Sequence, residues 1–484
     1  MIHRLLRRSL LVLVFLPALA AAQAPAVPPP SAPATPILSG HWEGAIDIPG
    51  LALTVKVDLT ASGGAWTGTI DIPQQSAKGL PLEKISADGD HVRFSIASVP
   101  GDPTFDGRLE KGEVHGTFTQ GQGSYPFHLG REAVKEAHRP QEPQPPFPYT
   151  EEEATVQNGD VRLAGTLTMP PGPGPFPAVL LITGSGAQNR NEELLGHKPF
   201  LVLADHLARA GIAVLRMDDR GVGGSTGSVS EATTEDFAGD ALAGVHFLQA
   251  HARIAKDRVG LLGHSEGGLI APIAASRSKD VAFIILLAGP GVPGSEIIPA
   301  QVEKIDLAEG MPADQARKQA DLTRAALTMA RAENDPTALR SKLAKFFADN
   351  PDAMDAKAVE SIGGLEKFLD LQVMTLRSPW FRFFYDFDPR PALRQVRVPV
   401  LAVNGELDSQ VPLQQNLPAI EQALREARNP DVTIRPMPGL NHLFQTAKTG
   451  SPTEYATIEE TISPALLDVV TRWILERFAK TAKP

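Results

Sequence analysis

Short apolar runs alternate with amphipathic stretches over the C-terminal two thirds of the chain. Uninterrupted apolar strands of this kind are typical of a parallel sheet that is covered on both faces. The expected strands span residues 178–183, 212–216, 259–262, 281–287 and 398–403. Amphipathic stretches between them, such as residues 200–209 and 237–250, predict helices. The alternation predicts a doubly wound α/β sheet, in which ligands bind at the carboxyl ends of the strands.

A different pattern covers residues 40–131, where apolar and polar positions alternate, as at Leu53 and Val55. Turn residues interrupt this pattern about every 8–12 residues, which predicts a small antiparallel β-sandwich or barrel. Trp42 and Trp66 begin two copies of a short repeat. We interpret them as core residues, with a ligand cavity as the alternative.

Proline-rich segments border the alternating region and suggest the domain organisation. Residues 23–38 and 136–149 are expected to be stiff, extended linkers. They separate an antiparallel β domain of unassigned role at 39–135 from an α/β domain at 150–484. A helical cap is expected at about 293–391 of the α/β domain, where amphipathic stretches interrupt the strand pattern.

The first 22 residues have the pattern of a secretory signal peptide. Three arginines occur among the first eight residues, an apolar run covers 10–19, and small alanines follow. The run is short for a membrane span, although an uncleaved anchor is the alternative. We expect export to the periplasm or the medium, a mature chain that starts near Gln23, and no stable membrane insertion after cleavage.

Composition narrows the chemistry further. The 484 residues include no cysteine, which excludes disulfides, a thiol nucleophile and cysteine-ligated metals. The formal net charge of −10 argues against nucleic acid as a partner, because nucleic-acid binding needs a basic face. We therefore expect a protein without a cofactor that acts on a small molecule, and leave its oligomeric state open.

The clearest motif reads Gly263-His264-Ser265-Glu266-Gly267, between an expected strand and an expected helix. A G-x-S-x-G sequence in this context makes a sharp turn that presents the serine above the sheet. Gly263 and Gly267 must be small because the chain folds tightly there. Ser265 is therefore the candidate nucleophile, and His264 is interpreted as structural.

A serine hydroxyl needs a base, and His442 is the histidine that follows Ser265 in the sequence. Asp408 lies between them, just after an apolar strand, and can orient the imidazole. Glu406 is the rival acid. The order serine, aspartate, histidine is the order of α/β-hydrolases.

An oxyanion hole is expected from the same turn. One donor would be the backbone N–H of Glu266, the residue after the nucleophile. The second would come from the glycine-rich loop after residues 178–183, with Ser185 preferred over Gly186. A phosphate-binding loop is the alternative, but this loop lacks the lysine of a P-loop.

Residues 150–480 resemble the α/β-hydrolase superfamily, in particular exported esterases and serine aminopeptidase-like enzymes. The nucleophile motif and the order of Ser265, Asp408 and His442 carry this resemblance, and the stretches at 196–200, 218–223 and 288–291 add to it. The oxyanion loop departs from the common His-Gly pattern, since Thr183-Gly184 occurs instead. The resemblance implies a serine hydrolase with a helical lid.

The cap segment bears on the substrate. Helices are expected at 299–308, 313–332 and 337–348, followed by a dense aromatic cluster that includes Trp380 and Phe381. Such a cluster suits the wall of an acyl pocket, and it also suits packing of the lid on the core.

Three functions remain open from the sequence. A carboxylesterase would bind a small acyl ester and form an acyl-serine intermediate. A serine aminopeptidase would need an anionic cap site for the substrate amine, and the candidate carboxylates are Glu296, Glu303, Asp306 and Glu309. A catalytically inert envelope-binding protein is the third and least favoured reading.

Overall fold

The computed structural model describes residues 38–132, apart from 49–50, 63–64, 73–76, 98, 100 and 121–122, together with residues 139–361 and 364–479. The expected signal peptide, almost all of the first linker and the first residues of the second linker lie outside this part. The described chain divides into two compact units. One contains the strands before residue 132 with residues 344–372, and the other contains residues 139–343 and 373–479.

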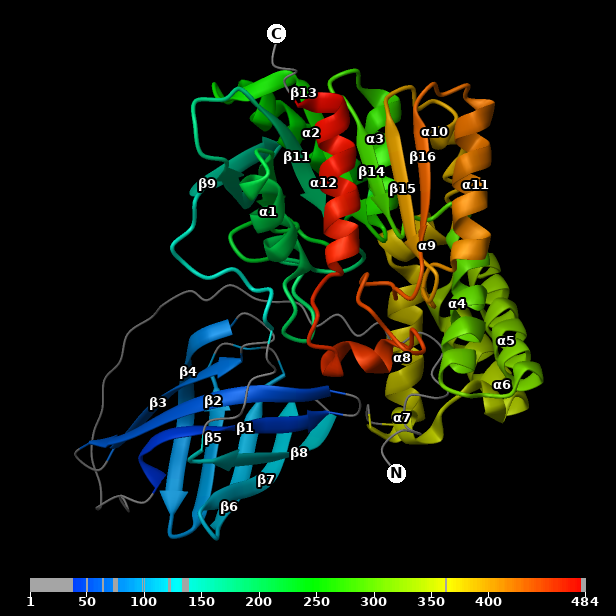
Figure 1. Ribbon diagram of the computed structural model, residues 1–484. Coiled ribbons are helices and arrows are strands. Elements are labelled where there is room, and N and C mark those ends of the chain that lie inside the picture. Colours follow the sequence, from blue (N-terminus) through cyan, green and yellow to red (C-terminus); the bar gives the residue numbers. More distant parts are fainter. Residues whose placement is uncertain are drawn as a thin grey trace. The chain divides into compact units, whose positions relative to one another are not determined.

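Eight antiparallel strands form a closed barrel in the first unit (Figure 1). The first strand closes the barrel because it pairs on one side with the second strand and on the other with the eighth. The strands are β1 (Gly40–Ile48), β2 (Leu51–Ser62), β3 (Ala65–Ile72), β4 (Ala77–Asp88), β5 (His91–Ile96), β6 (Thr104–Glu110), β7 (Glu113–Gln120) and β8 (Gly123–Gly130). The all-β prediction is confirmed, and the structure selects the barrel over the sandwich.

The barrel interior is apolar because alternate residues of each strand point inward. Phe105 packs against Phe94 and Phe118, with 4.7 Å between ring centroids in each pair. Trp42 is buried in this core, and its indole N–H donates to the Leu38 carbonyl at 2.9 Å. Trp66 packs against the same core. The interpretation of both tryptophans as core residues therefore agrees with the structure.

The second unit contains an eight-stranded mixed sheet in the order β16-β15-β14-β13-β11-β12-β10-β9. Strands β11 to β16 run parallel, whereas β9 pairs antiparallel with β10 and β10 pairs antiparallel with β12. The bounds are β9 (Thr150–Asn158), β10 (Val161–Met169), β11 (Phe176–Ile182), β12 (Ala213–Met217), β13 (Ile254–His264), β14 (Ile284–Leu287), β15 (Val400–Gly405) and β16 (Val432–Met437). The apolar runs did not predict β9 or β10, and β9 carries three consecutive glutamates.

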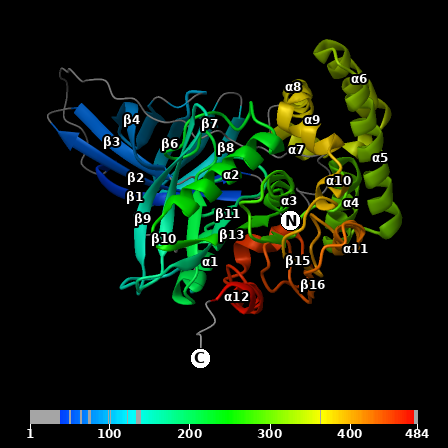
Figure 2. The same cartoon turned by 90° about the horizontal axis from the view of Figure 1, so that it is seen from above.

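Each face of this sheet has its own core, as the alternation along β11 shows. Leu180 belongs to the core that includes α2 and α3, whereas Leu181 belongs to the core that includes α1 and α12. Figure 2 shows these two helix layers on opposite sides of the sheet. The flanking helices are α1 (Pro199–Arg209), α2 (Thr234–Ala250), α3 (Gly267–Arg277), α11 (Leu413–Glu426) and α12 (Pro464–Phe478). The predicted doubly wound α/β fold is confirmed.

An insertion between β14 and β15 holds seven helices among its described residues, in agreement with the predicted helical cap. They are α4 (Gly294–Ala308), α5 (Ala313–Ala332), α6 (Pro336–Asp349), α7 (Ala356–Ser361), α8 (Leu365–Arg377), α9 (Pro379–Asp386) and α10 (Arg390–Leu393). Helix α9 begins at a strong local signal: Pro379 occupies its first turn, and the Ser378 hydroxyl accepts the backbone N–H of Phe381.

The proline-rich segment from residue 139 onward is fixed to the second unit. The Arg139 guanidinium donates to the carbonyls of Leu195, Ala456 and Ile458. The Gln141 side chain donates to the Ile462 carbonyl at 2.7 Å. Arg139 and Gln141 therefore belong to the α/β unit.

Candidate active site

The turn between β13 and α3 holds Ser265 in a strained backbone conformation. Its φ of +52° lies in the left-handed region that residues other than glycine seldom adopt. The Ser265 N–H donates to the Leu287 carbonyl at 2.8 Å, which fixes the turn to the neighbouring strand. A Cβ on Gly263 would lie 1.9 Å from the Gly267 carbonyl oxygen, and a Cβ on Gly267 would lie 2.2 Å from the Ile182 oxygen. The tight turn therefore requires both glycines.

Ser265, His442 and Asp408 form one chain of hydrogen bonds. His442 Nδ1 donates to Asp408 Oδ2 at 2.9 Å, and His442 Nε2 lies 3.1 Å from Ser265 Oγ. Because Nδ1 holds its proton toward the carboxylate, Nε2 is the ring nitrogen that accepts the serine proton. Asp408 and His442 are each 4% exposed. This geometry suits activation of a serine hydroxyl by a neutral imidazole.

Asp408 is the acid that the structure brings to His442, whereas Glu406 is exposed. The other oxygen of Asp408 accepts the backbone N–H groups of Gln410 and Val411, each at 2.8 Å. The loop after β15 therefore turns around this carboxylate and holds it in place.

The glycine-rich loop after β11 runs beside Ser265. A Cβ on Gly184 would lie 3.2 Å from the Ser265 Cβ. The Gly184 N–H donates to Glu192 Oε1 at 2.6 Å, so this amide has a partner within the protein. Ser185 and Gly186 follow directly, and Gly186 has a φ of +104°. The backbone amides of Glu266, Ser185 and Gly186 thus remain the candidates for an oxyanion hole.

The side chain of Glu266 connects the nucleophile turn with the cap. Trp380 Nε1 of α9 lies 2.8 Å from both oxygens of this carboxylate, and the Thr234 hydroxyl donates to it at 2.7 Å. Burial raises the pKa of the Glu266 carboxyl, and hydrogen bonds from Thr234, Trp380 and Ser185 oppose that rise. The sequence motif assigns a role only to the backbone N–H of Glu266. Its lone acidic side chain in a glycine-rich turn was the available signal.

The two aromatic candidates of the cap differ in their surroundings. Trp380 is partly buried, stacks on Phe384 with 5.5 Å between ring centroids, and reaches Glu266. Phe381 is 4% exposed, and its ring pairs with Tyr385 inside the same helix. Trp380 is therefore close to the candidate nucleophile, and Phe381 has the environment of a packing residue.

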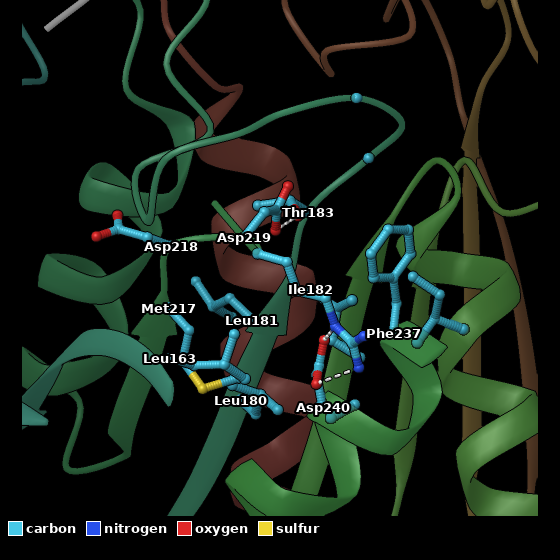
Figure 3. Close-up of a pocket in the computed structure, with 15 residues that line it drawn as sticks. Leu163, Leu180, Leu181, Ile182, Thr183, Met217, Asp218, Asp219, Phe237 and Asp240 are labelled. Atoms are coloured by element: carbon cyan, nitrogen blue, oxygen red, sulfur yellow. Dashed lines mark hydrogen bonds and ion pairs between the residues drawn. The ribbon is translucent and has the colours of Figure 1, made fainter. Parts of the chain in front are cut away.

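A small cavity of about 40 Å³ lies on the α2 side of the sheet, next to the glycine-rich loop (Figure 3). Gly184 and Gly186 line it together with apolar side chains such as Leu163 and Phe237. Neither Trp380 nor Phe381 is among its lining residues.

Asp219 lies at this cavity, and the pKa of its carboxyl group is strongly raised. The Thr183 hydroxyl donates to Asp219 Oδ1 at 2.8 Å, and the backbone N–H of Gln188 donates to Oδ2 at 2.9 Å. Figure 3 shows the first of these contacts directly beneath the loop. Burial raises the pKa of Asp219 well above its usual value, although both hydrogen bonds oppose the rise. The acid supports the loop that carries two of the oxyanion candidates.

The buried side chain of His197 lies next to the loop that carries His442. His197 Nδ1 lies 3.0 Å from the Thr461 hydroxyl, and Nε2 donates to the Tyr455 carbonyl at 2.9 Å. Gln445, three residues after His442, lies 3.1 Å from the same ring nitrogen. Burial lowers the pKa of His197 to about 4, so the ring is neutral at neutral pH.

The chain belongs to the alpha/beta hydrolase family, since the model of that family matches residues 179–457, more than half of its length. Esterase EstD of Thermotoga maritima is 25% identical over 379 residues, covering 76% of this chain and 78% of that protein. Acyl-coenzyme A thioesterase 1 of Homo sapiens is 30% identical over 130 residues, covering 26% of this chain and 27% of that protein. The chain is thus a hydrolase with esterase and thioesterase relatives.

A solved esterase of Pyrococcus furiosus, Pf2001, aligns with 72% of this chain and 99% of its own, at 17% identity and a TM-score of 0.41. In the part of the chain that the structure describes, no helix has the length and apolar character needed to cross a membrane.

Proposed function

We propose that the protein is a serine hydrolase that cleaves carboxylic acyl esters through an acyl-Ser265 intermediate. The observation that carries the proposal is the hydrogen-bonded series Asp408, His442, Ser265 on a strained strand-to-helix turn. The name of EstD, which is similar over most of its length, adds support for an ester as substrate.

The geometry provides a group for each step of the reaction. His442 Nε2 takes the Ser265 proton as Oγ attacks the ester carbonyl, and the negative oxygen receives hydrogen bonds from the amides of Glu266 and of Ser185 or Gly186. His442 then gives its proton to the leaving alcohol. Water enters, loses a proton to His442 and attacks the acyl carbonyl. His442 then returns the proton to Ser265 Oγ as the acid is released. Asp408 keeps the imidazole oriented and stabilises its charged form.

The aminopeptidase alternative needs an anionic cap site, and the contacts of three of the four candidate carboxylates favour other roles. Glu296 lies 3.9 Å from Arg390, and Glu303 lies 3.9 Å from Arg317. Glu309 accepts a hydrogen bond from Ser451 at 3.2 Å. These groups have protein partners, so we favour an uncharged acyl ester over a substrate with a free amine.

A substrate comparison tests the proposal. Purified protein should turn over p-nitrophenyl acyl esters faster than aminoacyl-p-nitroanilides or acyl-coenzyme A thioesters, and a fluorophosphonate should label Ser265 but not a Ser265→Ala variant. Preference for the anilides would support the aminopeptidase. Absence of labelling in a folded sample would support the inert binding protein.

We further propose export, on the basis of the first 22 residues of the sequence. Cell fractionation followed by N-terminal sequencing should give a mature chain that begins near Gln23. An intact N-terminus in the cytoplasmic fraction would contradict this.

A further inference from the structure

A second histidine, His264, lies next to the proposed catalytic residue His442. His264 precedes Ser265 in the turn, and its ring centroid is 4.9 Å from that of His442. Its Nδ1 lies 3.0 Å from Glu192 Oε1, and its Nε2 lies 2.9 Å from the backbone carbonyl oxygen of His442. Both His264 and Glu192 are buried.

The partners of His264 determine how many protons its ring carries. A carbonyl oxygen only accepts hydrogen bonds, so Nε2 must carry a hydrogen. Glu192 Oε1 already accepts the Gly184 N–H at 2.6 Å, so this oxygen acts as an acceptor, and Nδ1 must carry a hydrogen to donate to it as well. A ring with two N–H groups is an imidazolium.

The charged groups around this ring favour the same state. Glu192 approaches from the segment before α1, Asp408 from the loop after β15, and His442 from the loop after β16. Besides His442, the His264 ring contacts the ring of Phe444, which carries no charge. Burial opposes a charged ring, but the attraction of Glu192 and the hydrogen bonds outweigh it and raise the pKa of His264.

We propose that Glu192 and His264 form a buried charged pair that joins the oxyanion loop to the His442 loop and places a positive charge beside the His442 ring. The inference rests on the proposed function, because it concerns the same reaction, and it makes both groups positioning residues. Glu192 holds Gly184 of the first loop, and His264 holds the carbonyl of His442 in the second. The positive ring also disfavours a second positive charge on His442.

The electrostatic part of the proposal predicts the direction of a pH shift. His442 must be neutral to accept the Ser265 proton, so loss of this neutral form gives the acid limb of kcat/KM. His264→Gln removes the positive charge, keeps a donor for the His442 carbonyl, and leaves the Glu192 carboxylate unbalanced. The acid limb should therefore move to higher pH by about one unit.

The charge-neutral pair Glu192→Gln/His264→Gln provides the matched control. It lacks both charges, so its acid limb should return to within about 0.3 units of the wild type, although kcat is reduced by the looser loops. A role in packing alone predicts lower kcat or stability in all variants with an unmoved acid limb, and that result would overturn the proposal.

A spectroscopic measurement on the whole protein decides the protonation state without using activity. In ¹⁵N-histidine-labelled protein, the His264 signals, assigned by their loss in His264→Gln or His264→Asn, should show two protonated nitrogens at pH 7.5. A single-tautomer neutral pattern would refute the charged pair. Failure of ester turnover with the two-proton pattern present would count against the proposed function and leave the pair intact.

Discussion

The two units of this protein bury polar side chains in different ways. Among the described residues, the barrel buries two polar side chains, Glu43 and Ser95. Glu43 pairs with His41, whereas other ion pairs of the barrel, such as Arg108 with Asp90, lie on exposed positions. The α/β unit buries many more, and several lie where strands end, including His264 at the end of β13 and Asp408 after β15.

The proposed catalytic residues lie in the α/β unit, which buries more polar side chains. A buried polar group without a partner costs about 1–3 kcal/mol, so an apolar interior is the simpler way to build a stable domain. In the α/β unit that cost is offset by hydrogen bonds that join distant loops, and the same bonds set protonation states. The comparison predicts that changes at the ends of the sheet strands affect turnover strongly and that loss of the barrel does not.

Ser265→Ala should give the largest effect. Removal of the nucleophile should lower kcat on a p-nitrophenyl ester by about 10⁶-fold, because the acyl intermediate can no longer form. The far-ultraviolet circular dichroism spectrum should be unchanged. Comparable turnover by a folded variant would show that the chemistry lies elsewhere.

Asp408→Asn should lower kcat by about 10⁴-fold, since an amide favours the wrong tautomer of His442. Glu406→Gln is the matched control, because Glu406 is exposed two residues away, and we expect activity within about twofold of the wild type. The reverse ranking of the two variants would reassign the acid.

The buried His197 should make folding stability depend on pH. Its folded pKa of about 4 is below the ordinary value of 6.5, so the unfolded chain binds the proton more readily. This contribution is complete above pH 6.5 and is lost as the pH falls toward 4, by up to about 3 kcal/mol. Urea denaturation of wild type and His197→Gln at pH 7 and pH 4.5 measures it. Equal losses in both proteins would assign the acid sensitivity to other groups.

Trp380→Ala should change substrate preference more than turnover. Loss of one apolar contact is worth about 1–3 kcal/mol, so the ratio of kcat/KM for short and medium acyl esters should shift by about 10–100-fold. The kcat for an acetate ester should stay within roughly tenfold of the wild type.

Trp380→Phe is the control for the cap contact, since it keeps a ring and loses the hydrogen bond to Glu266. A lower melting temperature with an unchanged chain-length profile in both variants would assign Trp380 to packing alone.

Removal of the barrel should have the smallest effect. A chain that begins at residue 138 keeps the contacts of Arg139 and Gln141 with the α/β unit, and we expect its kcat on a small soluble ester to stay within a few-fold of the wild type. A soluble, monodisperse and inactive product would show that the barrel completes the site, and the contrast between the units would then fail.

The amino-acid sequence by itself determined the features that depend on local spacing. The apolar runs specified the parallel strands, and the glycines around Ser265 specified the turn, because a tight strand-to-helix connection tolerates few other residues there. The order of Ser265, Asp408 and His442 then followed from where the strands end.

Only the tertiary structure decided which distant groups meet. Alternation along a strand shows which face is buried but not which strand closes a barrel, so the pairing of β1 with β8 was not predictable. The contacts of Glu192 with His264 and of Trp380 with Glu266 join residues 72 and 114 positions apart. A hydrogen-bonded pair between separate loops produces no periodic sequence pattern in either loop. Each polar side chain has the local pattern of an ordinary surface residue, because its burial depends on residues that are distant in the sequence.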